Sequence, residues 1–247
     1  DFALAHSNLG VTLQELGKLA EAEASYNQAI VLDPDYAEAH SNLGNMLQEL
    51  GRQDEAGASF ARAIALKPDY AEAHSNLGNT LKELGRQDEA LASYNQAIAS
   101  KPDYAEAHSN LGITLQELGR LDEAEASYNQ AIALKPDHAE AHSNLGVTLK
   151  KLGRVDEAIA SYNQAIALKP DYAEAHSNLA ATLKELGRLD EALDGYAQAI
   201  ALKPDYADAH NNLGNTLKQL GKLAEAEASY RQAIALKPDF AEAHSNL

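Results

Sequence analysis

Apolar residues recur along the chain at the spacing of helix faces, in two stretches that alternate within every 34 residues. In residues 35–68, the first stretch contains Ala39, Leu43, Leu47 and Leu50 at intervals of four, four and three residues. This spacing places all four side chains on one side of a helix and predicts an amphipathic helix with a single buried face. Gly51 follows directly and is typical of a helix C-terminus.

The second apolar stretch passes through Ala56, Phe60 and Ala63 and predicts a second helix. Lys67 suits the negative C-terminal end of that helix, and Pro68 cannot continue it. The connection between the two predicted helices is so short that they must pack as an antiparallel hairpin.

Two further features of residues 35–68 concern how the helices begin and how they approach each other. Asp35, with Glu38 three residues later, predicts an N-cap and its capping-box partner at the start of the first helix. Gly44 stands inside the first helix, where glycine costs about 1 kcal/mol relative to alanine. We therefore expect Gly44 to mark a close approach to the second helix, with Phe60 filling the space beside it.

The pair of helices repeats with a fixed period of 34 residues, which is the signature of a repeat solenoid whose units must stack to bury their apolar faces. No linker or change of composition interrupts the period, so we predict one array across residues 1–247. Its expected units are residues 1–34, 35–68, 69–102, 103–136, 137–170, 171–204 and 205–238, with part of a further first helix in 239–247. The predicted fold class is an all-α solenoid.

The composition of the chain restricts the classes of partner that it can bind and the compartment that it suits. The net charge of −17 disfavours nucleic acid and anionic lipid, which attract basic proteins. The sequence contains no cysteine, no apolar run long enough for a membrane span and no signal-peptide pattern, which favours a reducing, cytoplasmic location. Because the chain starts at Asp1 and stops at Leu247 in the middle of the pattern, we expect a fragment of a longer array.

The repeated residues resemble the tetratricopeptide repeat (TPR) family. In residues 35–68 the positions that match the family pattern are His40, Leu43, Gly44, Leu47, Ala56, Phe60, Ala63 and Pro68. Two of them depart from its commonest choices, since His40 replaces a tryptophan and Leu47 a tyrosine. The run from Pro34 to Gly44 also resembles the TPR region of O-GlcNAc transferases and their bacterial relatives. The resemblance implies a right-handed superhelix whose inner groove is lined by the first helices.

The most regular polar residue of the predicted groove is an asparagine in every first helix, which we call the asparagine column. Its members are Asn8, Asn42, Asn76, Asn110, Asn144, Asn178, Asn212 and Asn246. A side-chain amide both donates and accepts hydrogen bonds and can pair with the backbone of any peptide sequence. The alternative interpretation is that near-identical repeats copy the residue without using it.

Two further sets of residues are candidates for the same groove. Asn45, Asn79 and Asn215 lie three residues after members of the asparagine column and could add a second amide. Lys150, Lys184 and Lys218 stand where three of the earlier repeats carry Gln14, Gln48 and Gln116. This difference predicts a ligand whose basic end faces the early repeats and whose acidic end faces the late ones.

Enzymatic chemistry is not expected. Eight histidines occupy one repeated position, but neighbours one repeat apart would lie about 8 to 10 Å from each other, too far to share a metal ion. His40 and the adjacent Ser41 point in different directions on a helix, and no phosphate-binding glycine loop occurs. We predict no catalytic residue, no metal and no cofactor.

The sequence therefore predicts a scaffold that binds a protein, as an extended peptide or a partner helix, in its groove. One alternative is the substrate-recruiting arm of a larger glycosyltransferase-like enzyme. Others are an array that associates head to tail through uncapped ends, and a designed array with no natural ligand.

Overall fold

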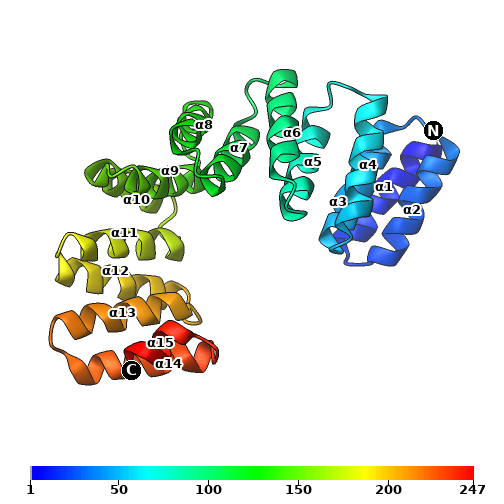
Figure 1. Ribbon diagram of the computed structural model, residues 1–247. Coiled ribbons are helices and arrows are strands. Elements are labelled where there is room, and N and C mark those ends of the chain that lie inside the picture. Colours follow the sequence, from blue (N-terminus) through cyan, green and yellow to red (C-terminus); the bar gives the residue numbers. More distant parts are fainter. Residues whose placement is uncertain (1) are drawn as a thin grey trace. The chain divides into compact units, whose positions relative to one another are not determined.

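The computed structural model describes residues 2–247, and within that range it contains fifteen α-helices and no β-strand (Figure 1). The helices come in consecutive pairs, and each pair occupies one 34-residue period. The first helices of the pairs are α1 (Phe2–Glu15), α3 (Ala37–Glu49), α5 (Ala71–Glu83), α7 (Ala105–Glu117), α9 (Ala139–Lys151), α11 (Ala173–Glu185) and α13 (Ala207–Gln219). The second helices are α2 (Leu19–Leu32), α4 (Gln53–Leu66), α6 (Gln87–Ser100), α8 (Leu121–Leu134), α10 (Val155–Leu168), α12 (Leu189–Leu202) and α14 (Leu223–Leu236). The last helix is α15 (Ala241–Asn246). The predicted all-α fold of helix-turn-helix pairs is confirmed.

The glycine after each first helix ends it as predicted. Gly51 has a φ of +73°, the left-handed conformation that glycine adopts without steric cost. Its N–H donates to the carbonyl of Gln48 at 2.9 Å, and the next N–H, that of Arg52, donates to Leu47 at 2.9 Å. This pair of bonds is a Schellman motif, which satisfies carbonyls that the helix leaves free.

The predicted capping box is wrong. Helix α3 begins at Ala37, its N-cap residue is Tyr36, and no side chain caps it. The backbone around Asp35 forms a turn instead, in which the Tyr36 N–H donates to the Asp33 carbonyl at 3.2 Å. The Asp35 N–H donates to the Asp33 carboxylate, also at 3.2 Å. The turn moves the N-cap from the expected Asp35 to Tyr36, so the helix begins one residue later than predicted.

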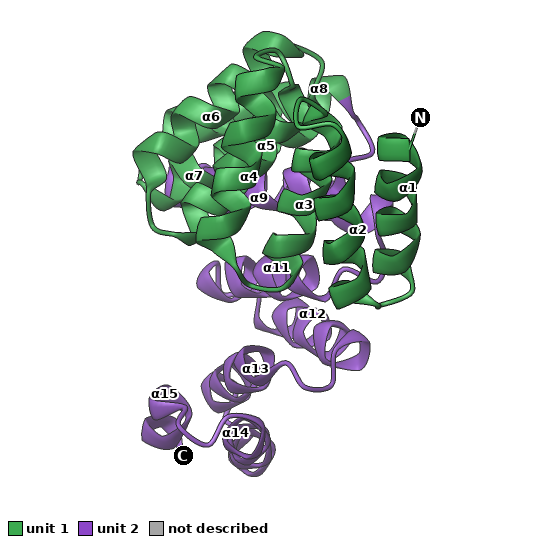
Figure 2. Cartoon of the chain, turned by 90° about the vertical axis from the view of Figure 1, so that its right-hand side faces the viewer, with its two compact units in different colours: residues 1–134 green, residues 135–247 purple. Residues whose placement is uncertain are grey.

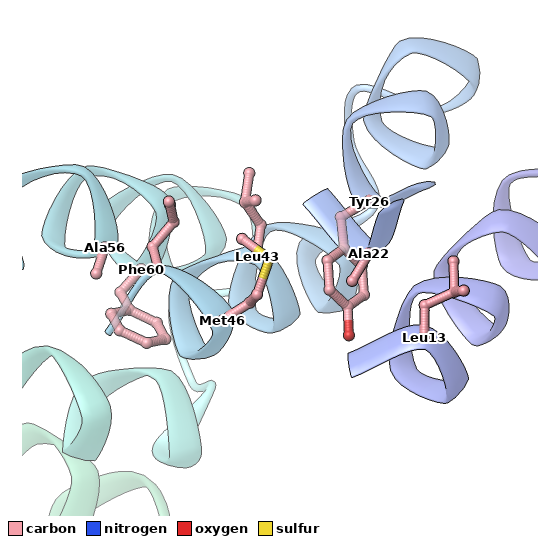
Figure 3. Close-up of a cluster of buried hydrophobic side chains, with 8 residues drawn as sticks. Leu13, Ala22, Tyr26, Leu43, Met46, Ala56 and Phe60 are labelled. Carbon is pink, nitrogen blue, oxygen red and sulfur yellow. The ribbon is translucent and has the colours of Figure 1, made fainter. Parts of the chain in front are cut away.

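The two helices of a pair pack as closely as the recurring glycine predicts. A Cβ placed on Gly44 would lie 2.7 Å from the Phe60 ring, so no side chain fits there. Tyrosine takes the place of Phe60 in the other pairs, and the same approach occurs between Gly78 and Tyr94. Figure 3 shows part of the resulting core, in which Leu43, Met46 and Phe60 of one pair join Leu13 and Tyr26 of the preceding pair.

The chain divides into two compact units, residues 1–134 and residues 135–247 (Figure 2). Inside each unit, the second helix of a pair packs against the first helix of the next, as α2 does on α3 and α10 on α11. First helices of neighbouring pairs also contact each other, for example α1 with α3 and α11 with α13. That both units act as one array stays a prediction.

Candidate functional site

The asparagine column lies on the part of each first helix that the pairing helix does not cover. Ala39 and Leu43 are buried, whereas Asn42, between them in sequence, is half-buried. Asn8 is exposed and every other member of the column is half-buried. Apart from Asn246, which ends α15, each of these residues lies within a first helix, and its side chain remains partly open to solvent.

Some of the amides bridge neighbouring first helices. The Nδ2 atom of Asn76 donates to Oδ1 of Asn45 at 2.8 Å, and that of Asn246 donates to Oδ1 of Asn211 at 3.2 Å. Asn42 reaches the Ser7 hydroxyl at 3.4 Å. Each of these bonds uses one N–H, and the amide oxygen is left free to accept.

Other members of the column make no such bridge. Asn110, Asn178 and Asn212 have no side-chain hydrogen bond to any residue in the range 2–247. Their backbone carbonyls accept from threonine hydroxyls one turn later, as that of Asn178 does from Thr182 at 2.8 Å. The column thus combines amides that hold repeats together with amides whose polar atoms are available.

The second set of asparagines has a structural partner that sequence reasoning missed. Oδ1 of Asn79 accepts from the buried hydroxyl of Tyr94 at 2.8 Å, and Oδ1 of Asn215 accepts from Tyr230 at 2.9 Å. A signal exists in the sequence, because tyrosine follows asparagine at the same separation of fifteen residues in both repeats. Asn45 belongs to the one described repeat with phenylalanine at that place, and its oxygen serves Asn76 instead.

The three lysines of the predicted site differ in their surroundings. The Lys150 ammonium lies 2.7 Å from a carboxylate oxygen of Glu185, one repeat later. Lys218 donates to the backbone carbonyl of Asn246 at 3.1 Å. Lys184 has no ion pair in the described range 2–247, so it is the lysine whose charge is least compensated.

A cleft of about 380 Å³ opens between α1 and α3 and contains two of the predicted residues, Asn42 and Asn45. Glu15 and Glu49 also border it, together with Gln14, Val11 and Tyr26. The pKa of the Tyr26 hydroxyl is raised above its ordinary value, first by burial and then by the charges of Glu15 and Glu49. The cleft is therefore polar, negatively charged and continuous with the asparagine column.

A larger cleft, of about 500 Å³, lies between α4, α5 and α6. It exists because Gly57 has no side chain at a position where other second helices carry Leu91, Ile159 or a glutamate. Leu77 and Leu81 form part of its wall, and no member of the asparagine column borders it.

The repeated histidines serve local structure. In seven repeats the Nε2 atom lies within hydrogen-bond distance of the carbonyl of the proline six residues earlier, at 2.9 Å for His74 and Pro68. The ring thereby braces the turn that precedes its own helix. Across residues 2–247, no three histidine or carboxylate side chains are grouped so as to hold a metal ion.

The 34-residue period, the paired helices and the glycine–aromatic contact together define a tetratricopeptide repeat array. Residues 3–246 match the family described as the cilia and flagella-associated protein 70 C-terminal domain, a TPR domain, and the chain belongs to this family. No curated protein matches the sequence. No helix in residues 2–247 has the length and apolar character needed to cross a membrane.

Solved structures support the same fold. A chain of the APC/C hetero-tetramer Cut9–Hcn1 is 20% identical with a TM-score of 0.79, and the match covers 96% of this chain but 47% of that one. A tetratricopeptide repeat protein from Parabacteroides merdae ATCC 43184 is 18% identical with a TM-score of 0.77, over 99% and 97% of the two chains. YrrB, described as a TPR protein with an unusual peptide-binding site, is 26% identical with a TM-score of 0.60, over 76% and 97%. The fold is that of a protein-interaction scaffold.

Proposed function

We propose that the chain is a scaffold that binds an extended peptide along its first helices, through the asparagine column. The observation that carries this proposal is the uncommitted amides of Asn110, Asn178 and Asn212, which recur at the same place on first helices of the array. An extended peptide exposes a donor and an acceptor at every residue, which is what an amide can pair with regardless of sequence. YrrB, which is described as having an unusual peptide-binding site, provides independent support.

Single contacts of this kind are weak. Each hydrogen bond contributes about 0.5 to 1.5 kcal/mol net, so useful affinity requires several repeats to act together. Lys184 favours one orientation of the bound peptide, because its unpaired charge attracts acidic residues of the peptide near α11. The proposed function requires no catalytic residue.

The test uses a phage-displayed library of random dodecapeptides, selected against the whole chain. An enriched peptide is then synthesised and its Kd is measured by fluorescence anisotropy against the triple variant Asn110→Ala, Asn178→Ala and Asn212→Ala. Loss of three hydrogen bonds should raise Kd by roughly ten-fold or more. Because these amides bond to no described side chain, and alanine is the better helix former, their removal should not lower the temperature of thermal unfolding.

The matched control replaces three exposed asparagines of second helices, Asn27→Ala, Asn129→Ala and Asn163→Ala. This variant loses the same chemical groups from the other helix of the pairs and should keep the wild-type Kd. Equal affinity of the two triple variants, or a selection that enriches no peptide, would contradict peptide binding by the column.

A further inference from the structure

The cleft between α1 and α3 contains a carboxylate that the fold holds in a fixed position. The Tyr26 hydroxyl donates to Oε1 of Gln14 at 2.9 Å, and Nε2 of Gln14 donates to Oε2 of Glu49 at 2.7 Å. This relay begins in the buried core, since Tyr26 is almost fully enclosed. It orients the Glu49 carboxylate toward the cleft and uses only one of its oxygens.

Two equivalent glutamates in later repeats are paired with lysine, and those at the cleft are not. The Glu185 carboxylate pairs with Lys150 at 2.7 Å, and the Glu117 carboxylate pairs with Lys82 at 3.9 Å. At the cleft, the place of the lysine is taken by the neutral amide of Gln14, so no cation pairs with Glu49 among residues 2–247.

Glu15, the second carboxylate of the cleft, is exposed and has no ion pair within the described residues 2–247. Two uncompensated negative charges therefore border one cleft. Asn42 adds an amide oxygen that makes no bond in the described structure, since Asn42 uses only its Nδ2 atom. All of these groups are hydrogen-bond acceptors.

We propose that this cleft binds the side chain of an arginine or lysine from the peptide that occupies the asparagine column. The inference rests on the proposed function, because the same cleft includes Asn42 and Asn45. Charge-assisted hydrogen bonds from a guanidinium or ammonium group are about twice as strong as neutral ones. The volume is at the lower end of the range of about 300 to 1,000 Å³ for ligand sites, which suits one side chain better than a folded partner.

The site supplies what a basic side chain needs and little else. Glu15 and Glu49 provide charge, and the oxygen of Asn42 accepts a further N–H. An acidic side chain would meet two carboxylates and be repelled, and an apolar one would leave them without a partner. The cleft thus selects a basic residue at one position of the bound peptide, whereas the asparagine column accepts any sequence at the others.

The experiment repeats the dodecapeptide selection with the wild-type chain and with the variant Glu15→Gln, Glu49→Gln. The wild type should enrich arginine or lysine at one fixed position of the selected peptides, and the variant should lose that preference. The matched control is Glu117→Gln, Glu185→Gln, which removes glutamates of equivalent position that lysine already pairs, and it should keep the preference.

A second measurement uses the synthesised best peptide and its analogue with the basic residue replaced by citrulline, which is neutral and of arginine-like shape. Citrulline should raise Kd by about ten-fold on the wild type, or about 1.4 kcal/mol, and change it little on Glu15→Gln, Glu49→Gln. Peptides that depend on the asparagines but show no basic preference would overturn this inference and leave the proposed function standing. A failure to select any peptide would overturn both.

Discussion

At the scale of single residues, the buried tyrosine hydroxyls of the second helices differ in how they are satisfied. Tyr94 donates to Asn79 at 2.8 Å, whereas the Tyr196 hydroxyl is buried and has no partner among residues 2–247. The difference follows from the sequence, because Ala181 stands where Asn79 stands in the earlier repeat. A buried polar group without a hydrogen bond costs about 1 to 3 kcal/mol.

This contrast predicts opposite effects of one substitution at two equivalent positions. Tyr94→Phe should lower the free energy of unfolding by about 1 kcal/mol, because it breaks a bond and leaves the Asn79 oxygen unpaired. Tyr196→Phe should be neutral or stabilising, because it removes only an unpaired hydroxyl. Urea unfolding followed by circular dichroism measures both, and equal losses in the two variants would show that Tyr196 has a partner.

A second contrast concerns Ala180, which stands where the other described first helices have glycine. The second helix of the same repeat compensates, since Gly195 replaces the serine of the other repeats, and a Cβ on Gly195 would lie 2.9 Å from the Ala180 Cβ. We expect Gly195→Ser to lower the unfolding free energy by about 1 to 3 kcal/mol through overpacking. Adding Ala180→Gly to it should restore most of the loss, which a double-mutant cycle detects as a coupling energy. Additive effects would mean that the two positions do not compensate.

At the scale of helices and turns, glycine has three different roles, and replacing a glycine of each kind by alanine distinguishes them. Gly119 ends α7 at a φ of +74° with open space around it, so Gly119→Ala should cost about 1 kcal/mol from backbone strain alone. Gly112→Ala should cost about 1 to 3 kcal/mol, because its Cβ would lie 2.7 Å from the Tyr128 ring. Gly57→Ala should raise stability by about 0.5 to 1 kcal/mol, since its Cβ would meet Thr80 at an ordinary 3.6 Å inside α4. Thermal unfolding ranks the three variants, and a common sign would contradict these assignments.

The sequence predicts helix ends unevenly, and the reasons are physical. Gly51 could be identified because the left-handed conformation after a helix has a strong residue preference. The start of α3 could not, because it is set by a backbone turn from Asp33 to Tyr36 that competes with capping by Asp35. Side-chain capping rules apply to a helix end whose backbone N–H groups are free. At the start of α3, the N–H groups of Asp35 and Tyr36 already bond to Asp33 in a turn.

At the scale of the whole molecule, the period predicts the architecture far better than it predicts the site. The contact between Gly44 and Phe60 follows from small and large residues that recur in register, so the core could be predicted. The bonds of the asparagine column could not, because they depend on the neighbouring repeat. Asn76 donates to Asn45, whereas Asn79, at the equivalent position before Asn110, accepts from Tyr94 instead. The charge of the cleft between α1 and α3 likewise depends on a glutamine that precedes Glu49 by one repeat.

The same repetition places tyrosines in the core of both units, which makes the fold sensitive to alkaline pH. Burial raises the pKa of the hydroxyls of Tyr94, Tyr128, Tyr162 and Tyr196 well above the ordinary value. The unfolded chain ionises its tyrosines near pH 10, while the folded chain holds them neutral. The stability they provide is therefore complete below about pH 10 and is lost as pH rises from there toward the folded pKa.

We therefore expect helical circular dichroism and the ultraviolet absorbance of tyrosinate to change together above about pH 10. The buried tyrosines can ionise only when a repeat opens, and each repeat supports its neighbours, so the change should be steep. Tyr162→Phe should move the midpoint to higher pH, because one fewer group ionises on unfolding. Ionisation of all eleven tyrosines while the helical signal stays constant would show that these buried hydroxyls reach solvent without unfolding.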